Sequence, residues 1–389
     1  MSSSLIIEVC RVGKITKHPD ADRMAVVEIK GWKTCIKRND DGTTQFEEGE
    51  LCIFFPPDSV LPPTLSDRLA VTNYLKKLSG NASGGRVVVS RLRGQPSYGF
   101  ISKLDILPET SIWSEGNDVA DILGVTKWQP PMSCTDGDAE VPHPAFHRYY
   151  DMENIKNFPN VIPNRESVII TEKIHGKNAR VGLIREAHSD GKPQWTWMAG
   201  SHDVRRKESV KRKRKITDEK TGEQKIEEYD EKSQFWQVLD KNGSSLREMI
   251  SAISGEKNNV VVFGEIFGSG VQDMTYGMTA GNWSFRVFDI TVNKIYLSVT
   301  EKIDWLTKFD VEMVPVLYMG PFSNEEVEKY TSGNNTISEQ PGTFKGREGI
   351  VITSIAEQTV STSKRLMERM VFKSINFEYL ERKNGTEFH

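Results

Sequence analysis

The strongest constraint on this chain is a set of five short segments that follow one another in a fixed order over roughly two hundred positions. Each segment combines strand-like apolar residues with charged or aromatic side chains. The segments are residues 172–178 (Glu-Lys-Ile-His-Gly-Lys-Asn), 263–268 (Phe-Gly-Glu-Ile-Phe-Gly), 285–290 (Phe-Arg-Val-Phe-Asp-Ile), 348–352 (Glu-Gly-Ile-Val-Ile) and 372–374 (Phe-Lys-Ser). Together they predict a reactive lysine, Lys173, and the pocket that surrounds it.

The composition is that of a soluble protein with two or three domains. The chain has 389 residues, 37% of them hydrophobic, and no apolar run approaches the roughly 20 residues of a membrane span. The start of the sequence lacks the features of a secretory leader, so we expect an intracellular protein, cytoplasmic or nuclear. We also expect a monomer. Four cysteines, at positions 10, 35, 52 and 134, form no Cys-x-x-Cys pair, so we expect reduced thiols rather than a zinc site or disulfides.

Periodicity divides the chain into two domains. Short alternating apolar runs at 5–9, 24–29 and 51–55, separated by Gly and Pro, predict an all-β barrel or sandwich over residues 1–125. A proline-rich stretch then predicts a linker at 126–145. From 146 to 389, strand-like runs at 167–170, 260–263 and 285–288 alternate with helical candidates at 233–239 and 246–253. This alternation predicts an α+β domain with antiparallel sheets.

One segment is much more basic than the net charge of −3 suggests. Its cations are Arg205, Arg206, Lys207, Lys211, Arg212, Lys213, Arg214 and Lys215, and an acid-rich stretch follows from 218 to 232. We interpret 204–232 as a charged insertion in the second domain. Three roles stay open from the sequence: a solvated mobile insertion, an arm that contacts phosphates, or a nuclear-targeting signal.

The chemistry of Lys173 depends on losing a proton. A lysine amine has a reference pKa of about 10.4 and is therefore charged at neutral pH, whereas only the neutral amine is a nucleophile. Neighbouring cations and a bound divalent metal would lower the pKa, and Lys177, Lys373 and a metal near Glu265 and Glu348 are the candidates. The neutral amine could then attack the α-phosphorus of a nucleoside triphosphate.

The five segments resemble those of the covalent nucleotidyltransferases, the superfamily of polynucleotide ligases and mRNA capping enzymes. The closest resemblance is to ATP-dependent RNA ligases of the phage type that repairs nicks in duplex RNA, and residues 146–154, 172–178 and 263–272 match that family closely. Residues 17–24 resemble a turn of tRNA-binding OB-folds. The Naegleria type of RNA ligase places an OB domain ahead of such a catalytic module, and this chain looks like that type throughout.

The resemblance implies a fold and an activity. The fold is an α+β nucleotidyltransferase (ATP-grasp-like ligase) domain with antiparallel sheets, preceded by an all-β OB-fold domain that docks RNA. The activity is that of an ATP-dependent RNA ligase (EC 6.5.1.3), which seals 3′-hydroxyl and 5′-phosphate RNA ends through lysyl-AMP and RNA-adenylate. The implied cofactors are ATP and Mg²⁺ or Mn²⁺, and the implied partner is RNA.

The resemblance also assigns roles residue by residue. The implied roles are Lys173 as the adenylylated nucleophile, Glu172 at the adenine, Arg148 in ATP binding, His175 and Asn178 organising the nucleotide and the end being sealed, Glu265 and Glu348 at the ribose and metal, Phe288 stacked on adenine, and Lys373 at the phosphates. Gln272 occupies a family position to which we assign no step.

Two departures from the family pattern leave positions open. The second lysine of the last segment is absent, and Lys364, Arg365 or Arg369 are candidates to replace its charge. The arginine expected after the first segment is also absent, because Ser201 or His202 stands in its place, and Arg205 is the candidate substitute.

Two other functions remain alternatives. A DNA ligase is one, although DNA ligases and capping enzymes generally carry Asp at the position of His175 and place their OB domain after the last segment. The other is an RNA-binding protein whose nucleotidyltransferase domain is inactive. The argument against this alternative is that the set of motif residues is intact: Lys173, Glu265, Glu348 and Lys373.

Overall fold

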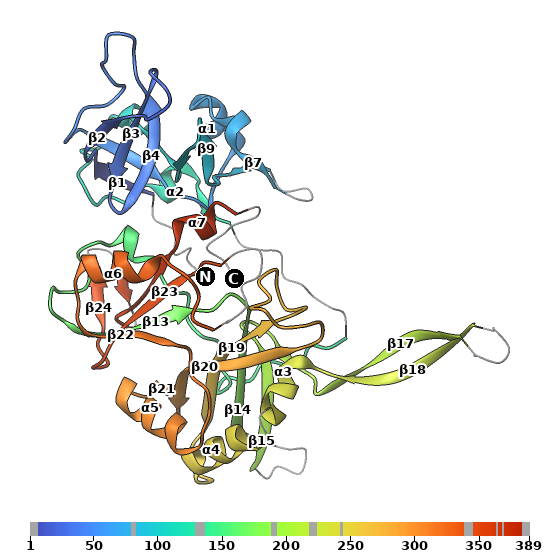
Figure 1. Cartoon of the computed structure of the whole chain (residues 1–389). Coiled ribbons are helices and arrows are strands. Elements are labelled where there is room, and N and C mark those ends of the chain that lie inside the picture. Colours follow the sequence, from blue (N-terminus) through green and yellow to red (C-terminus); the bar gives the residue numbers. More distant parts are fainter. Residues whose placement is uncertain are drawn as a thin grey trace.

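The chain folds into two domains, one above the other in Figure 1. The computed structural model describes residues 7–78, 83–128, 137–187, 193–217, 224–241, 244–337, 345–362, 365–367 and 369–382. Within these residues no helix is long and apolar enough to cross a membrane. Three cysteines, at positions 10, 35 and 52, are free thiols, while Cys134 lies outside the described residues.

The N-terminal domain consists of short antiparallel sheets, as the alternation predicts. Its elements are β1 (Glu8–Arg11), β2 (Ile15–Lys17), β3 (Met24–Ile29), β4 (Trp32–Lys37), β5 (Leu51–Phe55), β6 (Ser59–Leu61), α1 (Pro63–Arg68), η1 (Thr72–Tyr74), β7 (Lys76–Lys77), β8 (Gly85–Arg86), β9 (Ser90–Leu92), β10 (Gln95–Ser97), β11 (Phe100–Ser102), η2 (Leu104–Ile106), α2 (Ala120–Leu123) and β12 (Thr126–Lys127). The sheet orders are β1-β5-β11, β2-β3-β4, β10-β9 and β12-β6-β8-β7. Along β4 every second side chain is buried, so one face of this strand meets the core.

The C-terminal domain contains two larger sheets. Its elements are η3 (Ile155–Asn157), β13 (Ser167–Lys173), β14 (Lys177–Ala187), β15 (Pro193–Ser201), β16 (Arg205–Arg206), β17 (Ser209–Thr217), β18 (Gln224–Lys232), α3 (Gln234–Gln237), η4 (Val238–Asp240), α4 (Ser245–Ser254), β19 (Val260–Gly268), β20 (Trp283–Val292), β21 (Ile295–Tyr296), α5 (Val299–Lys308), β22 (Val316–Pro321), α6 (Asn324–Thr331), β23 (Gly349–Ser354), β24 (Val360–Thr362), β25 (Arg365–Met367), β26 (Val371–Ile375) and α7 (Phe377–Leu380). One sheet has the order β22-β13-β23-β26 and the other β16-β15-β14-β19-β20-β21.

The six-stranded sheet is covered on both faces. Every residue of its central strand β19 is buried. On one face α4 packs Leu246, Met249 and Ile250 against β19, and this spacing of three and four positions is that of an amphipathic helix. Gly255 ends the helix in a left-handed conformation with φ 50°. The two central strands of this sheet carry Asn178 on β14 and Glu265 on β19, which lie opposite each other.

The boundary between the domains lies slightly beyond the predicted one. β12 pairs with β6, so residues 126 and 127 belong to the N-terminal sheets and not to the linker. At the other end, Ala139 forms a β-bridge with Arg206, so the predicted linker region already pairs with the C-terminal domain there. Residues 129–136, where the proline-rich stretch begins, lie outside the described residues.

The charged segment forms a hairpin of β17 and β18 that projects from the body of the molecule (Figure 1). The basic strand is paired with the acid-rich strand, and cross-strand ion pairs join Arg212 to Glu231, Lys213 to Glu228 and Arg214 to Glu227 at 3.0, 3.0 and 2.6 Å. Much of the positive charge is therefore balanced within the hairpin, and exposed pairs of this kind are worth roughly 0–1 kcal/mol each.

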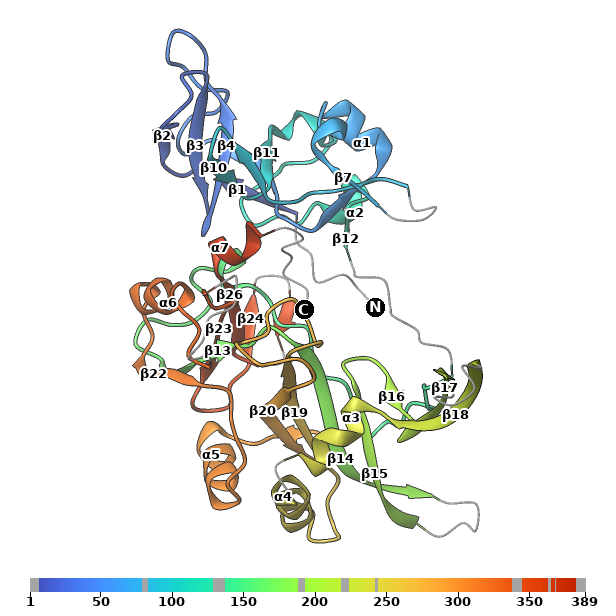
Figure 2. The ribbon, with the colours of Figure 1, turned by 45° about the vertical axis from the view of Figure 1, so that its right-hand side comes forward.

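The two domains meet at the short C-terminal helix α7, which lies between them in Figures 1 and 2. The ring of Phe377 lies 4.3 Å from the ring of Tyr98 and 6.1 Å from that of Trp32, both in the N-terminal domain. One buried cluster contains Trp32 and Tyr98 together with Ile174, the residue after Lys173. The N-terminal domain therefore packs directly behind the lysine segment.

Candidate active site

Lys173 is the last residue of β13, in the middle of the four-stranded sheet. Its ammonium donates a hydrogen bond to Oε1 of Glu348, a residue 175 positions away whose side chain is fully buried. Lys173 lies opposite Gly349 on β23, the neighbour of Glu348. A Cβ at Gly349 would lie 2.2 Å from the carbonyl oxygen of Ser374, so this close approach of β23 to β26 requires glycine.

Glu265 lies on β19 and shares this buried environment. Burial raises its pKa to about 8, with the neighbouring Glu348 acting in the same direction, although the charge of Lys173 and a hydrogen bond from the backbone of Gly176 oppose the rise. Asn178 on β14 is directly opposite Glu265 in the ladder, so the two side chains share one face. The carboxyl is thus largely protonated at neutral pH in the protein without ligands.

We expect Glu265→Gln to flatten the pH dependence of stability between about pH 5 and 8. The carboxyl titrates near 4.3 in the unfolded chain and near 8 in the folded one, so the folded state binds the extra proton between these values and stability falls as pH rises. The effect is on the order of a few kcal/mol. Urea unfolding of protein free of metal and nucleotide, with exposed Glu325→Gln as control, measures it. An unchanged slope in the Glu265 variant would contradict this assignment.

His175 is buried and held on three sides. Its Nε2 lies 2.7 Å from a carboxylate oxygen of Asp273, its Nδ1 lies 2.8 Å from the hydroxyl of Tyr379, and its backbone N–H donates to the hydroxyl of Tyr276 at 2.7 Å. Nδ1 also lies 3.8 Å from Oε2 of Glu348. Burial lowers the pKa of His175, although the charges of Glu348 and Asp273 oppose this shift.

Glu172 lies on the opposite face of β13 from Lys173. Its Oε2 accepts hydrogen bonds from the backbone N–H and the hydroxyl of Thr336, at 2.9 and 2.7 Å. Burial raises the pKa of Glu172, against these two hydrogen bonds. Glu172 is thereby tied to the segment that precedes the fourth motif.

Three buried oxygens at the site have no hydrogen-bond partner among the residues that the structure describes: Oε1 of Glu172, Oδ1 of Asn178 and Oε2 of Glu348. Buried polar atoms are normally hydrogen-bonded, so the unsatisfied oxygens of Asn178 and Glu348, both near Glu265, fit a site that receives donors or a cation from a ligand. No group of three His, Cys, Asp or Glu side chains in the described ranges could hold a metal by itself. The two glutamates would suit a hydrated ion that shares substrate phosphates.

Phe288 occupies a β-bulge. β19 pairs Phe263 with Asp289 and then Gly264 with Val287, so Phe288 is the extra residue and its side chain leaves the strict alternation of β20. Its half-buried ring makes an edge contact with the ring of Tyr149 at 5.1 Å. The bulge re-aims this aromatic side chain, which packs against the buried cluster that contains Ile174.

Lys373 lies on β26, and its backbone N–H donates to the carbonyl of Glu153 at 2.9 Å. It pairs with Val351, which pairs with Thr171, so Lys373 and Lys173 share one face of the four-stranded sheet. Both lysines thus point toward the same side of the sheet, as expected for two groups that serve one set of phosphates.

Arg148 contacts the segment at residues 202 and 203. Its guanidinium donates to Asp203 at 3.3 Å, and His202 contacts the same carboxylate at 3.1 Å. Arg148 therefore reaches the segment in which the family's arginine is missing. Arg205, the candidate substitute, is instead paired with Glu186 at 2.9 Å and also contacts Glu140.

Arg369 does not supply the positive charge of the second lysine that is missing from the last segment. Its guanidinium is buried and hydrogen-bonded to Asp289 and Glu357, so its charge is already balanced. Lys364 and the side chain of Arg365 lie outside the described residues. Gln272 donates to the carbonyl of Gly176 at 3.4 Å and so supports the loop that carries His175.

Several residues that complete this site were not predicted from the sequence: Asp273, Tyr276, Thr336 and Tyr379. None belongs to the five segments, and each reaches the site through the tertiary fold. Asp273 follows Gln272, so the neighbourhood of a recognised position was the only available hint.

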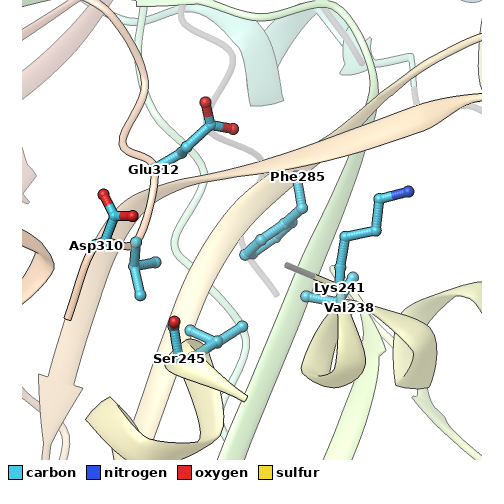
Figure 3. Close-up of a pocket in the computed structure, with 8 residues that line it drawn as sticks. Val238, Lys241, Ser245, Phe285, Asp310 and Glu312 are labelled. Carbon is cyan, nitrogen blue, oxygen red and sulfur yellow. The ribbon is translucent and has the colours of Figure 1, made fainter. Parts of the chain in front are cut away.

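A separate pocket lies on the far side of the six-stranded sheet, where Phe285 of β20 faces Val238, Lys241 and Ser245, with Asp310 and Glu312 at its rim (Figure 3). None of the residues that line it belongs to the lysine site.

Two family models match the chain, one in each domain. The RNA ligase family model matches residues 166–375, and a model of an OB-fold domain matches residues 6–104. No curated protein matches the chain. The N-terminal domain is thus an OB-fold, and the predicted order of the two domains is confirmed.

Several solved structures match over nearly the whole chain. Naegleria gruberi RNA ligase with PPi has a TM-score of 0.69 and 23% identity, covering 97% of this chain and 98% of that one. Mutants of the same enzyme with ATP and Mn, and with AMP and Mn, have TM-scores of 0.70 and 0.71 at 22% identity, covering 98% of this chain and 100% and 99% of theirs. At this level of identity the likeness shows a shared fold.

Proposed function

The chain belongs to the RNA ligase family, whose model spans more than half of its length, and on that premise we propose that it is an ATP-dependent RNA ligase that joins 3′-hydroxyl and 5′-phosphate ends. The observation that carries the proposal is the hydrogen bond of Lys173 to buried Glu348, with Glu265 beside them. The structures of the Naegleria gruberi enzyme with ATP and Mn support the choice of nucleotide and metal.

The first step is transfer of AMP to Lys173. The ammonium first gives a proton to Glu348 along its hydrogen bond, and the lone pair of the resulting amine forms a bond to the α-phosphorus of ATP as the bond from that phosphorus to pyrophosphate breaks. The nitrogen then loses a second proton to solvent, which leaves lysyl-AMP. AMP then passes from Lys173 to the 5′-phosphate of RNA. In the last step the 3′-hydroxyl attacks this phosphate and expels AMP.

Mg²⁺ or Mn²⁺ would be held by Glu265 and Glu348, and would offset the negative charge of the phosphates. Oε2 of Glu348 is the available ligand atom, because Oε1 already accepts from Lys173. Metal binding would favour ionised Glu265, since a cation opposes the rise in pKa that burial causes.

Roles for the remaining residues follow from where they lie. We assign Lys373 to the phosphates because it shares a sheet face with Lys173. Phe288, at the bulge, is assigned to the adenine, and the free oxygen of Glu172 to the same base or its frame. Arg148 is assigned to the outer part of ATP, while Asn178 and His175 hold the nucleotide and the RNA end.

The OB-fold domain is proposed to dock RNA. His18 in its tRNA-binding-like turn is not itself a contact residue, because it is fully buried and its ring bonds the carbonyl of Leu92 and the backbone N–H of Asp20. Its role is to shape the turn that presents neighbouring exposed residues such as Lys17 and Arg23.

The function is tested by incubating the protein with four substrates: nicked duplex and single-stranded 5′-phosphorylated RNA, and their DNA counterparts, each with ATP and with GTP. Sealing of RNA with ATP is the expected result. Preferential sealing of DNA would identify a DNA ligase, and an absence of both sealing and protein labelling would identify an inactive RNA-binding relative.

A further inference from the structure

Helix α7 touches both the catalytic domain and the OB-fold domain within six residues. On one side the hydroxyl of Tyr379, which is 1% exposed, contacts Nδ1 of His175. On the other side Glu381, just after the helix, accepts a hydrogen bond from the hydroxyl of Tyr98 at 2.6 Å and is paired with Arg91, both in the OB-fold domain.

A second chain of contacts leads to the same histidine. Arg382, next to Glu381, is paired with Asp273, and the other carboxylate oxygen of Asp273 contacts Nε2 of His175. Although partial burial opposes it, the hydrogen bond and charge of Arg382 and the contact with His175 lower the pKa of Asp273, so this side chain is a carboxylate. His175 is thus contacted at both ring nitrogens by groups that α7 and its extension hold.

These contacts define one tautomer of His175. A carboxylate only accepts hydrogen bonds, so Nε2 must carry the proton that it donates to Asp273. In a neutral ring Nδ1 is then an acceptor, and the hydroxyl of Tyr379 donates to it. Nδ1 is the nitrogen that faces Glu348 at 3.8 Å. With no proton on Nδ1, His175 does not compete with Lys173 for the carboxylate of Glu348.

We propose that α7 couples the OB-fold domain to the reactive lysine: Asp273 sets the Nε2–H tautomer of His175, Tyr379 holds the ring by donating to Nδ1, and Tyr98 of the OB-fold domain holds α7 through its contacts with Phe377 and Glu381. Tyr379 and Asp273 are positioning residues, since they act through His175. The proposal rests on the ligase function for its catalytic consequence, but the tautomer is a property of the protein without ATP or RNA.

The tautomer is measured by NMR of protein labelled with ¹⁵N in histidine, where the signals of His175 are identified by their loss in His175→Gln. We expect the wild type to show the Nε2–H form. Asp273→Ala removes the acceptor and should produce Nδ1–H or a mixture, whereas Tyr379→Phe removes only the hydroxyl at Nδ1 and should keep Nε2–H. A wild type with Nδ1–H, or an Asp273→Ala variant that keeps Nε2–H unmixed, would overturn the proposal.

Kinetics test the consequence for sealing. We expect Tyr379→Phe and Asp273→Ala to lower kcat for RNA sealing roughly tenfold or more, with KM for ATP nearly unchanged, because partners that orient a functional histidine have effects of this size. Exposed Glu325→Ala is the control and should match the wild type. A tautomer change that leaves kcat unaltered would refute the coupling to catalysis.

The part played by the OB-fold domain is tested with Tyr98→Phe, which keeps the ring in contact with Phe377 and removes only the hydrogen bond to Glu381. We expect a smaller fall in kcat, and little further loss when this change is added to Asp273→Ala, since both act on one chain of contacts. Independent, multiplicative losses would overturn this link. If the wild type seals no RNA, the ligase function fails, while the NMR result still decides whether Asp273 sets the tautomer.

Discussion

Lys173→Ala should abolish transfer of label from α-labelled ATP to the protein and, with it, the sealing of 5′-phosphorylated RNA. Alanine has no nucleophile to form the phosphorus–nitrogen bond, because the amine that Lys173 places beside Glu348 is lost. We expect a loss of at least a thousandfold, within the range known for removal of covalent catalytic residues. Gel detection of the labelled protein and of the sealed RNA measures both effects.

RNA that is already adenylylated provides a positive control for the Lys173→Ala variant. RNA that is supplied already adenylylated at its 5′ end needs no lysyl-AMP, so Lys173→Ala should still seal it if the remaining site is intact. Lys308→Ala, a change at an exposed residue of α5, should behave as the wild type in both assays. Persistent labelling of the Lys173 variant would remove this lysine from its assigned role.

Asp289→Asn should cause a large loss of stability in the catalytic domain. Its buried carboxylate accepts hydrogen bonds from Arg369 at 2.5 Å and from Tyr149 at 2.9 Å, and it is paired with Lys302 at 3.5 Å. Asparagine would leave two buried cations without their shared anion, and breaking such a pair costs about 3–5 kcal/mol. Urea unfolding at pH 7 measures this loss, with exposed Asp304→Asn as control.

The pH dependence of the same substitution has a definite sign. Burial would raise the pKa of Asp289, but Lys302 and Arg369 outweigh it and lower the pKa. A carboxyl with a lowered pKa stabilises the fold above its unfolded value of about 3.9 and loses that contribution as pH falls below it. The difference between wild type and Asp289→Asn should therefore be constant from pH 7 to about 5 and shrink only near pH 4 and below. A difference that disappears already at pH 6 would contradict the assignment.

The sequence predicted the parts of the fold in which apolar periodicity and the motif segments agree. The runs at 24–29 and 51–55 are β3 and β5, the run at 260–263 opens β19, and the helical candidate at 246–253 is α4. The buried residues of α4 repeat with the helical period, and β3, β5 and β19 are mostly or wholly buried, so local pattern and tertiary packing favour the same structure.

The sequence could not predict elements in which that pattern is absent. β17 is a run of basic residues with little apolar alternation, and its strand structure comes from pairing with the acid-rich strand β18. Phe288 was predicted as a strand residue with a stacking role, but the bulge that re-aims it depends on the register of β19, which one strand alone does not reveal.

The candidate site, too, was predicted only in part from the sequence. Lys173, Glu265 and Glu348 meet as the motif order implies. The groups that fix the ring of His175 were missed because Asp273 and Tyr379 come from a loop and a terminal helix with no motif of their own. Their role exists only once α7 is packed under the OB-fold domain, which is a consequence of long-range packing.

The central claim is that Lys173 carries the nucleotide, and mapping of the adduct tests it most directly. Protein incubated with ATP and Mn²⁺, without RNA, is digested under mildly alkaline conditions that preserve a phosphorus–nitrogen bond and is analysed by mass spectrometry. We predict one AMP on the peptide that contains Lys173, and its release when pyrophosphate or 5′-phosphorylated RNA is added. An AMP group on any other residue, or no adduct under conditions in which RNA is sealed, would contradict the claim.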